Sequence, residues 1–215
     1  MTDKHFTEGV FNDSGYYSWQ VNRITFVLEK YGENYFKGKK VLELACFEGG
    51  ISQMLHNLGA NLVSVEGLER NLNVCKQRYP HLTFIQKDLD LDQWDFDDHY
   101  DIIIHWGLLY HLRDPDSSMR HCLEHCDYLF LESLVIDYST KYTSHVVEEN
   151  KWGTDQSIHC MGSRFSAKYV ENLFDNKPFV RYDDAKLNSS YQPQYDWTES
   201  DTGNIYRRFW VITCK

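Results

Sequence analysis

Residues 40–50 read KVLELACFEGG, an apolar run that ends in a carboxylate and then in a turn closed by two glycines. Two further runs of this kind follow, NLVSVEG at 61–67 and LTFIQKD at 82–88. Short apolar runs separated by helical patterns predict parallel strands with crossover helices between them. Because the carboxyl ends of parallel strands meet in one crevice, we expect a ligand site there. The carboxylates that this arrangement collects are Glu43, Glu66 and Asp88.

The hydrophobic periodicity predicts the remaining elements on both sides of this stretch. Helices are expected at 19–31, 50–58, 69–79, 115–124 and 166–174, and strands at 40–44, 61–65, 82–86, 100–104, 128–132, 179–182 and 208–213. Residues 134–165 show no clear periodicity, and a stretch of this length inside a compact domain is usually functional. The length of 215 residues fits a single domain.

The chain carries 22 basic and 32 acidic residues, a formal net charge of −10 at pH 7. Nucleic acid usually meets a basic protein face, so this balance argues against such a partner, although basic clusters at 37–40 and 207–208 leave room for a local contact. No run approaches the roughly 18 apolar residues of a membrane span, and the polar start lacks a signal-peptide core. The six cysteines fall largely at expected core positions, which favours free thiols and a cytoplasmic location.

A further conspicuous stretch, GLLYHLRDP at 107–115, follows the expected fourth strand. Together with the first turn, Glu66 and Asp88, it resembles the class I S-adenosylmethionine-dependent methyltransferases, in a branch that carries a GLLYHL-type segment. The segment DQSIHCMGSRFSAKY at 155–169 is similar to one in a largely uncharacterised subgroup of this family. The resemblance therefore covers nearly the whole chain after residue 40.

The resemblance implies an α/β fold with a Rossmann-like, seven-stranded, mostly parallel sheet in the order 3-2-1-4-5-7-6 and helices on both faces. It also implies one methyltransferase domain over residues 1–215, with an N-terminal lid and helix at 1–36 and an acceptor-side loop at 134–165. Tyr16, Tyr17 and Trp19 fit either a lid over the cofactor or an aromatic staple for the first helix.

The cofactor that the resemblance implies is S-adenosyl-L-methionine (SAM), with S-adenosyl-L-homocysteine (SAH) as its product. A carboxylate can accept from both ribose hydroxyls, and a small turn lets the methionine part pass the backbone. The residues expected to bind the cofactor are Glu43, Ala45, Phe47, Gly49, Glu66, Gly67, Asp88, Leu89, His105 and Gly107. The family has glycines at the positions of Ala45 and Phe47, so the ring of Phe47 either turns out of the crevice, which we favour, or alters the site.

For a hydroxyl acceptor, histidine is the natural general base because its pKa lies near the operating pH. We expect His111, Asp155 and Arg164 to hold or deprotonate the acceptor. Gln156 and Asn188 are expected in the same pocket. His111 fits a structural role equally well, and Arg164 and Asp155 also fit an ion pair that only orders the loop.

The expected activity is methyl transfer to a small-molecule, glycan or sugar-like acceptor, most readily at oxygen. Two alternatives stay open at this point. One is a tRNA or nucleotide methyltransferase, since a tRNA-modifying branch shares the GLLYHL-type segment. The other is a non-catalytic SAM-binding regulatory domain, for which the bulky Phe47 gives a reason.

Two patterns could suggest a metal site, and we expect none. His121, Cys122, His125 and Cys126 form two pairs at helical spacing, but a structural zinc site normally draws ligands from a second element. The two cysteines also suit the core. The seven aspartates of 88–101 lack the glycine and the glutamate that a calcium loop needs.

Overall fold

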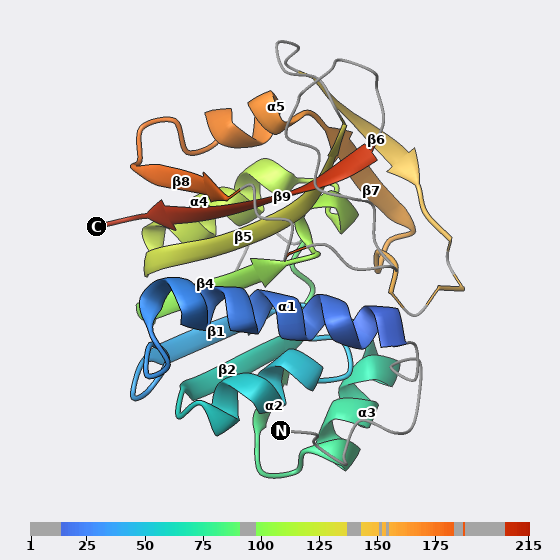
Figure 1. The fold of residues 1–215 in the computed structure, drawn as a ribbon. Helices are drawn as coiled ribbons and strands as arrows, with labels where there is room; N and C mark the ends of the chain where they lie inside the picture. Colours follow the sequence, from blue (N-terminus) through green and yellow to red (C-terminus); the bar gives the residue numbers. More distant parts are fainter. Residues whose placement is uncertain are drawn as a thin grey trace.

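The computed structural model describes residues 14–90, 98–136, 143–150, 152–153, 155–182, 187 and 205–215. Its centre is a seven-stranded sheet in the order β3-β2-β1-β4-β5-β9-β8, with helices on both faces (Figure 1). The first five strands of this order are parallel, and β9 is antiparallel to both of its neighbours. Counted along the chain within the sheet, the order is the expected 3-2-1-4-5-7-6, so the predicted fold class is confirmed.

The elements lie close to their expected positions. The helices are α1 (Ser14–Tyr31), α2 (Gly50–Asn57), α3 (Glu69–Arg78), α4 (Pro115–Glu124) and α5 (Ala167–Asn172), with a 3-10 turn η3 (Leu109–His111). The strands are β1 (Lys40–Leu44), β2 (Asn61–Glu66), β3 (Thr83–Gln86), β4 (Tyr100–Trp106), β5 (Cys126–Ile136), β6 (Ser144–Glu148), β7 (Met161–Phe165), β8 (Phe179–Tyr182) and β9 (Ile205–Thr213). Among the described residues, no helix has the length and apolar character that crossing a membrane requires. Residues 1–13 of the expected lid lie outside the described part of the chain.

Two helices begin with side-chain caps that the sequence signals. Ser166 accepts from the backbone N–H of Tyr169 at 3.2 Å and caps α5, as predicted. Asp114 accepts from the backbone N–H of Ser117 at 3.0 Å and caps α4, with Pro115 in its first turn. Each cap satisfies a donor that the first helical turn leaves open, and such a contact stabilises a helix by about 1 kcal/mol.

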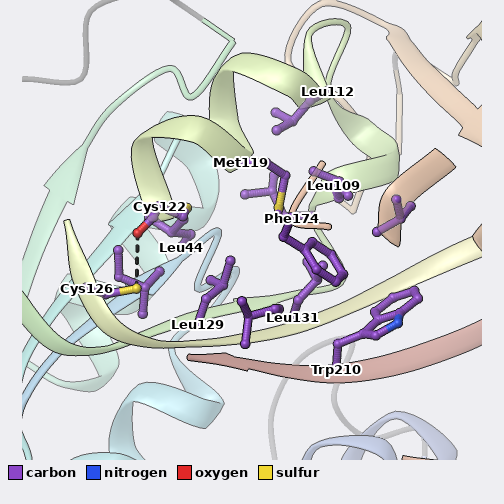
Figure 2. Close-up of a cluster of buried hydrophobic side chains, with 14 of the residues drawn as sticks. Leu44, Leu109, Leu112, Met119, Cys122, Cys126, Leu129, Leu131, Phe174 and Trp210 are labelled. Carbon is purple, nitrogen blue, oxygen red and sulfur yellow. Dashed lines mark hydrogen bonds between the residues drawn. The ribbon is translucent and has the colours of Figure 1, made fainter. Parts of the chain in front are cut away.

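Alternate residues of the central strands face opposite sides of the sheet. Ile102 and Ile104 of β4 join the buried cluster beneath α1 and α2, whereas Ile103 joins the cluster beneath α4 and α5. Figure 2 shows this second cluster, in which the thiol of Cys126 donates to the carbonyl oxygen of Cys122 at 3.0 Å. Both cysteines therefore pack in the core.

The stretch 134–165 was expected to be a loop, and this expectation was wrong. The strands β6 and β7 pair there as a two-stranded antiparallel ribbon. Ser163 Oγ donates to the Leu112 carbonyl oxygen at 2.7 Å, which holds the ribbon against the end of η3. Most of β6 is exposed, so it lacks the alternation of apolar and polar residues that reveals a half-buried strand in a sequence.

A buried ion cluster joins α1 to the sheet. Glu132 of β5 accepts from Arg23 of α1 at 2.8 Å and from Arg207 of β9 at 2.8 and 2.9 Å. Arg207 also donates to the hydroxyl of Tyr110 at 3.2 Å, and the guanidinium of Arg23 lies 3.7 Å from the centre of the Trp19 ring. Burial acts to raise the pKa of Glu132, but the two guanidiniums lower it below its ordinary value, so the carboxylate is ionised.

The substitution Glu132→Gln leaves both guanidiniums beside a neutral amide in buried surroundings. We expect it to lower the free energy of unfolding by about 3–5 kcal/mol, the usual cost of breaking a buried charge cluster. Urea unfolding followed by circular dichroism measures this difference. The matched control, Glu148→Gln on the exposed face of β6, should stay within about 0.5 kcal/mol of the wild type. Equal stability of the two variants would contradict the role of Glu132.

Candidate active site

A cavity of about 400 Å³ lies at the carboxyl ends of the parallel strands, within the size range of small-molecule sites. Its wall comes from β1, β2 and β4, from α1 and η3, and from the segment around the β6–β7 ribbon. The predicted site residues that line it are Glu43, Ala45, Phe47, Glu66, Gly67, Asp88, Leu89, Gly107, His111, Asp155 and Arg164. The sequence therefore placed the cavity at the correct edge of the sheet.

The turn after β1 has a backbone conformation that usually requires glycine, but two of its positions carry Ala45 and Phe47. Ala45 and Phe47 adopt φ angles of 54° and 56°, in the left-handed region that costs a residue with a side chain roughly 1–2 kcal/mol. Glu66 at the end of β2 stabilises the turn, since it accepts from the backbone N–H of Phe47 at 2.9 Å and of Leu68 at 2.8 Å. Phe47 is buried and forms part of the wall, in agreement with the alternative in which the aromatic residue alters the crevice.

Glu43 lines the cavity and is almost fully buried. Its Oε2 accepts from the hydroxyls of Ser52 at 2.5 Å and Ser64 at 2.9 Å, which come from α2 and β2. Burial, the larger effect, raises the pKa of Glu43 to about 7, although the two hydroxyls act to lower it. This carboxyl therefore titrates near neutral pH.

The segment 155–160, from which the sequence led us to expect acceptor contacts, also contacts residues that we expected to bind the cofactor. His159 Nε2 lies 2.7 Å from Asp88 Oδ2. Ile158 packs so closely on Gly67 that a Cβ at position 67 would overlap it, which explains the glycine there. Gln156 also lines the cavity, as expected, while Asn188 lies outside the described residues. The segment thus lies at the carboxyl ends of β2 and β3 as well as near Glu149.

Two predicted cofactor residues are not part of the cavity wall. His105 is fully buried, and its Nε2 lies 3.1 Å from Ser118 Oγ of α4. The alternation of β4 explains the correction, because its neighbours Ile104 and Trp106 face the cavity and His105 faces the other side of the sheet. Burial lowers the pKa of His105 to about 4, so its ring is neutral. Gly49 does not line the wall either, and instead caps α2 with a φ angle of 82°.

His111 is held by a buried glutamate that the sequence did not reveal. Glu149 Oε2 lies 2.6 Å from His111 Nδ1 and accepts from the backbone N–H of Ser157 at 2.9 Å. Its Oε1 receives longer contacts from Arg164, at 3.3 and 3.4 Å. Burial acts to raise the pKa of Glu149, but the bond to His111 and the nearby guanidinium lower it below its ordinary value. Glu149 therefore stays ionised and acts as the acceptor, and His111 donates from Nδ1.

Several cavity residues that sequence reasoning missed come from segments far from the first turn. Five of these distant residues are Gln20, Tyr110, Glu149, Ile158 and Arg207. Tyr110 stands inside the GLLYHL segment and was available as a signal. Glu149 and Arg207 offered none, because only the pairing of β6 with β7 and of β5 with β9 brings them to the cavity. Trp19, weighed as a lid residue, is buried and packs on Gly107, whose φ of 73° and close approach both suit glycine.

Among the described residues, Asp88, Asp90 and His159 place potential metal ligands within 4.8 Å of one another. Asp90 has other partners, since its Oδ1 accepts from the backbone N–H groups of Arg113 at 2.8 Å and Asp114 at 3.3 Å. These contacts account for the position of Asp90 without an ion. The cluster at 121–126 packs as helix and core, with His125 Nδ1 2.8 Å from the carbonyl oxygen of residue 121.

Comparison with known proteins points to one family. The profile of a methyltransferase domain family matches residues 19–179. The ubiquinone biosynthesis O-methyltransferase of Proteus mirabilis (strain HI4320) is 27% identical over 89 residues, which make up 40% of this chain. That match spans only 36% of the length of the relative.

Similar solved structures share the fold at low sequence identity. The N-terminal domain of EvdMO1 with SAH bound aligns with a TM-score of 0.69 and 15% identity, over 91% of this chain and 80% of that one. Magnesium protoporphyrin IX methyltransferase from Synechocystis PCC 6803 with bound SAM aligns with a TM-score of 0.61 and 14% identity, over 98% and 88% of the two chains. At these identities the likeness is one of fold.

The raised pKa of Glu43 predicts a pH-dependent effect of Glu43→Gln. The pKa of this carboxyl is higher in the folded than in the unfolded chain. The folded state therefore loses stability as the pH rises from about 4.5 to about 7, and this loss remains at every pH above 7. The amide of glutamine does not ionise, so it removes this loss of stability, and its oxygen can still accept from the hydroxyls of Ser52 and Ser64. We expect the variant to exceed the wild type in stability by about 1–3 kcal/mol at pH 8 and to match it near pH 4.

Urea unfolding at a series of pH values between these limits tests this expectation. The exposed control Glu124→Gln should follow the wild-type pH dependence throughout. A constant difference between Glu43→Gln and the wild type at every pH would show that Glu43 titrates normally.

Proposed function

The chain belongs to the methyltransferase domain family, and from this premise we propose that it transfers the methyl group of SAM to a hydroxyl oxygen of a small polar acceptor. SAM is the cofactor that this family and this fold indicate. One observation carries the proposal: a single cavity joins the carboxylates expected to bind the cofactor with a histidine held on a buried glutamate. The stretch 134–165 supplies residues to both halves of this cavity.

The cofactor half of the cavity fits an adenosine. Glu66, 5% exposed, places its carboxylate in the wall, where it can accept from ribose hydroxyls while it holds the turn after β1. Asp88 offers a carboxylate for the exocyclic amino group of adenine. Leu68, Leu89 and Ile158 give the adjoining wall an apolar surface suited to a flat base.

The part of the wall that Gln20 and Trp106 form fits an amino-acid group. Two of its buried polar atoms, Gln20 Oε1 and Trp106 Nε1, have no hydrogen-bond partner within the described part of the chain. One is an acceptor and the other a donor, so together they complement an ammonium and a carboxylate. Gln20 Oε1 lies over Gly50 at the start of α2, 2.5 Å from where a Cβ would stand. SAM carries both charged groups at its methionine end.

His111 is suited to remove a proton from the acceptor. Its Nδ1 proton is donated to Glu149, which leaves Nε2 as the basic nitrogen. The ionised Glu149 stabilises the imidazolium that forms when Nε2 takes the acceptor proton. SAM supplies a methyl group on a sulfonium, a good leaving group, so alignment and a timely proton transfer are what the protein adds.

The acceptor is small in this proposal. Cofactor and acceptor share one cavity of about 400 Å³, which leaves little room for a macromolecule. The formal net charge of −10 also disfavours a polynucleotide acceptor. Asp155 and Arg164 line the same cavity beside His111 and complete a polar acceptor end.

Cofactor binding is tested first. We expect SAH to bind with a dissociation constant in the micromolar range, about −8 kcal/mol, by titration calorimetry. Glu66→Ala should weaken this binding by about 1.5–3 kcal/mol, because it removes a charge-assisted acceptor. Glu69→Ala, an exposed neighbour outside the wall, should bind like the wild type. No heat and no thermal shift with SAM or SAH would refute the cofactor assignment.

The general base is tested with His111→Asn, whose side chain keeps a donor for Glu149 and has no basic nitrogen. With an acceptor found by screening hydroxylated compounds, we expect the turnover number to fall by about 10²–10⁴-fold. SAH affinity should stay within about threefold of the wild-type value, which shows that the cavity is intact. SAH formation under single-turnover conditions gives the rate.

Glu149→Gln provides the matching variant for the orienting carboxylate. It should lower turnover less than His111→Asn does, because the base remains and only its support changes. Full activity of His111→Asn would show that the acceptor loses its proton without this histidine.

A further inference from the structure

Arg164 is a guanidinium that the described contacts engage only in part, at the end of the cavity that holds His111. Its Nη1 donates to the carbonyl oxygens of Tyr110 at 3.1 Å and Ser163 at 3.0 Å. Both Nη atoms reach Glu149 Oε1, but at 3.3 and 3.4 Å, whereas tight charge-assisted bonds measure about 2.7–2.9 Å. Within the described part of the chain nothing accepts from its Nε, so one edge of the planar fork is open.

A close ion pair with a carboxylate would occupy the charge of Arg164. Glu149 instead makes its short contact, 2.6 Å, with His111 and leaves Arg164 the longer ones. Asp155 does not take the cation either, since its carboxylate accepts from the side chain of Gln156 at 3.1 Å and no described contact joins it to Arg164. The ion pair of Asp155 with Arg164 that the sequence allowed is therefore not formed, and the cation remains available to a ligand.

A second guanidinium lies across the same aromatic ring. Arg164 and Arg207 lie 5.8 and 5.5 Å from the centre of the Tyr110 ring, and all three residues line the cavity. Arg207 is paired with Glu132 at 2.8 and 2.9 Å. Arg164, in contrast, makes only the longer contacts with Glu149. Of these two cations in the wall, Arg164 is the one whose described contacts leave an edge for a ligand.

We propose, on the basis of the proposed function, that the acceptor is a small hydroxy-carboxylate whose carboxylate binds Arg164 and whose hydroxyl lies at His111. A planar guanidinium fork matches a planar carboxylate with two parallel hydrogen bonds. Arg164 and His111 contact the two oxygens of one carboxylate, that of Glu149, so they lie close together. The acceptor then carries its carboxylate and its reactive hydroxyl near each other, as a uronic acid or a short hydroxy acid does.

Glucuronate and glucose form a matched pair of probes, since they differ in the carboxylate at one carbon. Both are titrated by NMR into the complex of the protein with SAH, at low ionic strength. We expect wild-type protein to bind glucuronate at least about tenfold more tightly than glucose, the difference of roughly one charge-assisted contact. Arg164→Met should bring the ratio close to one. Arg113→Met, which removes a positive charge outside the cavity wall, should leave the ratio unchanged.

SAH affinity measured on the same samples keeps the inference separate from the proposed function. Arg164→Met must bind SAH within about threefold of the wild type, and Arg164→Lys, which keeps the charge and loses the fork, should show an intermediate ratio. If wild-type protein binds SAH and shows no preference for glucuronate, whether it binds both sugars or neither, the hydroxy-carboxylate assignment is overturned while the proposed function stands. If SAH itself does not bind, the proposed function fails.

Discussion

The cavity depends on a carboxylate that forms no part of its wall. Glu132 is buried in β5, beside the end of β4, and Arg23 and Arg207 lie against it and compensate its charge. Arg23 belongs to α1, so this charge requirement helps to fix the helix on its face of the sheet. Trp19 and Gln20, which line the cavity, lie in the preceding turn of that helix. The ion pair of Glu132 with Arg23 thus helps to position the residues that α1 contributes to the cavity wall.

The sequence predicted the fold and half of the cavity for one physical reason. The parallel strands are short apolar runs, and each ends at a residue whose place in the crevice follows from its position in the strand. Glu43, Glu66 and Asp88 could therefore be assigned together. The same rule misplaced His105, because it did not take the alternation of side chains along a strand into account. His105 and Trp106 point to opposite sides of the sheet. The register of β4 between β1 and β5 decides which of these two side chains lines the cavity.

The acceptor end could not be predicted in the same way. Glu149 follows a solvent-exposed strand, and Arg164 stands on the partner strand of the ribbon. Neither residue reaches His111 through local sequence, because the contact requires β6 and β7 to pair and the pair to rest on η3. A composition rich in polar residues indicated function for this stretch, but it carried no information on which polar groups meet. Pairing between distant segments is the part of a fold that periodicity leaves undetermined.

The two halves of the cavity are linked through the six residues 155–160. At one end of this segment the backbone N–H of Ser157 donates to the carboxylate oxygen of Glu149 that also holds His111. Two residues later His159 contacts Asp88. The segment between these contacts is too short to move at one end alone, since consecutive Cα atoms stay about 3.8 Å apart. A backbone displacement that takes His159 away from Asp88 therefore also acts on the N–H of Ser157. That N–H supports the Glu149 carboxylate that holds His111.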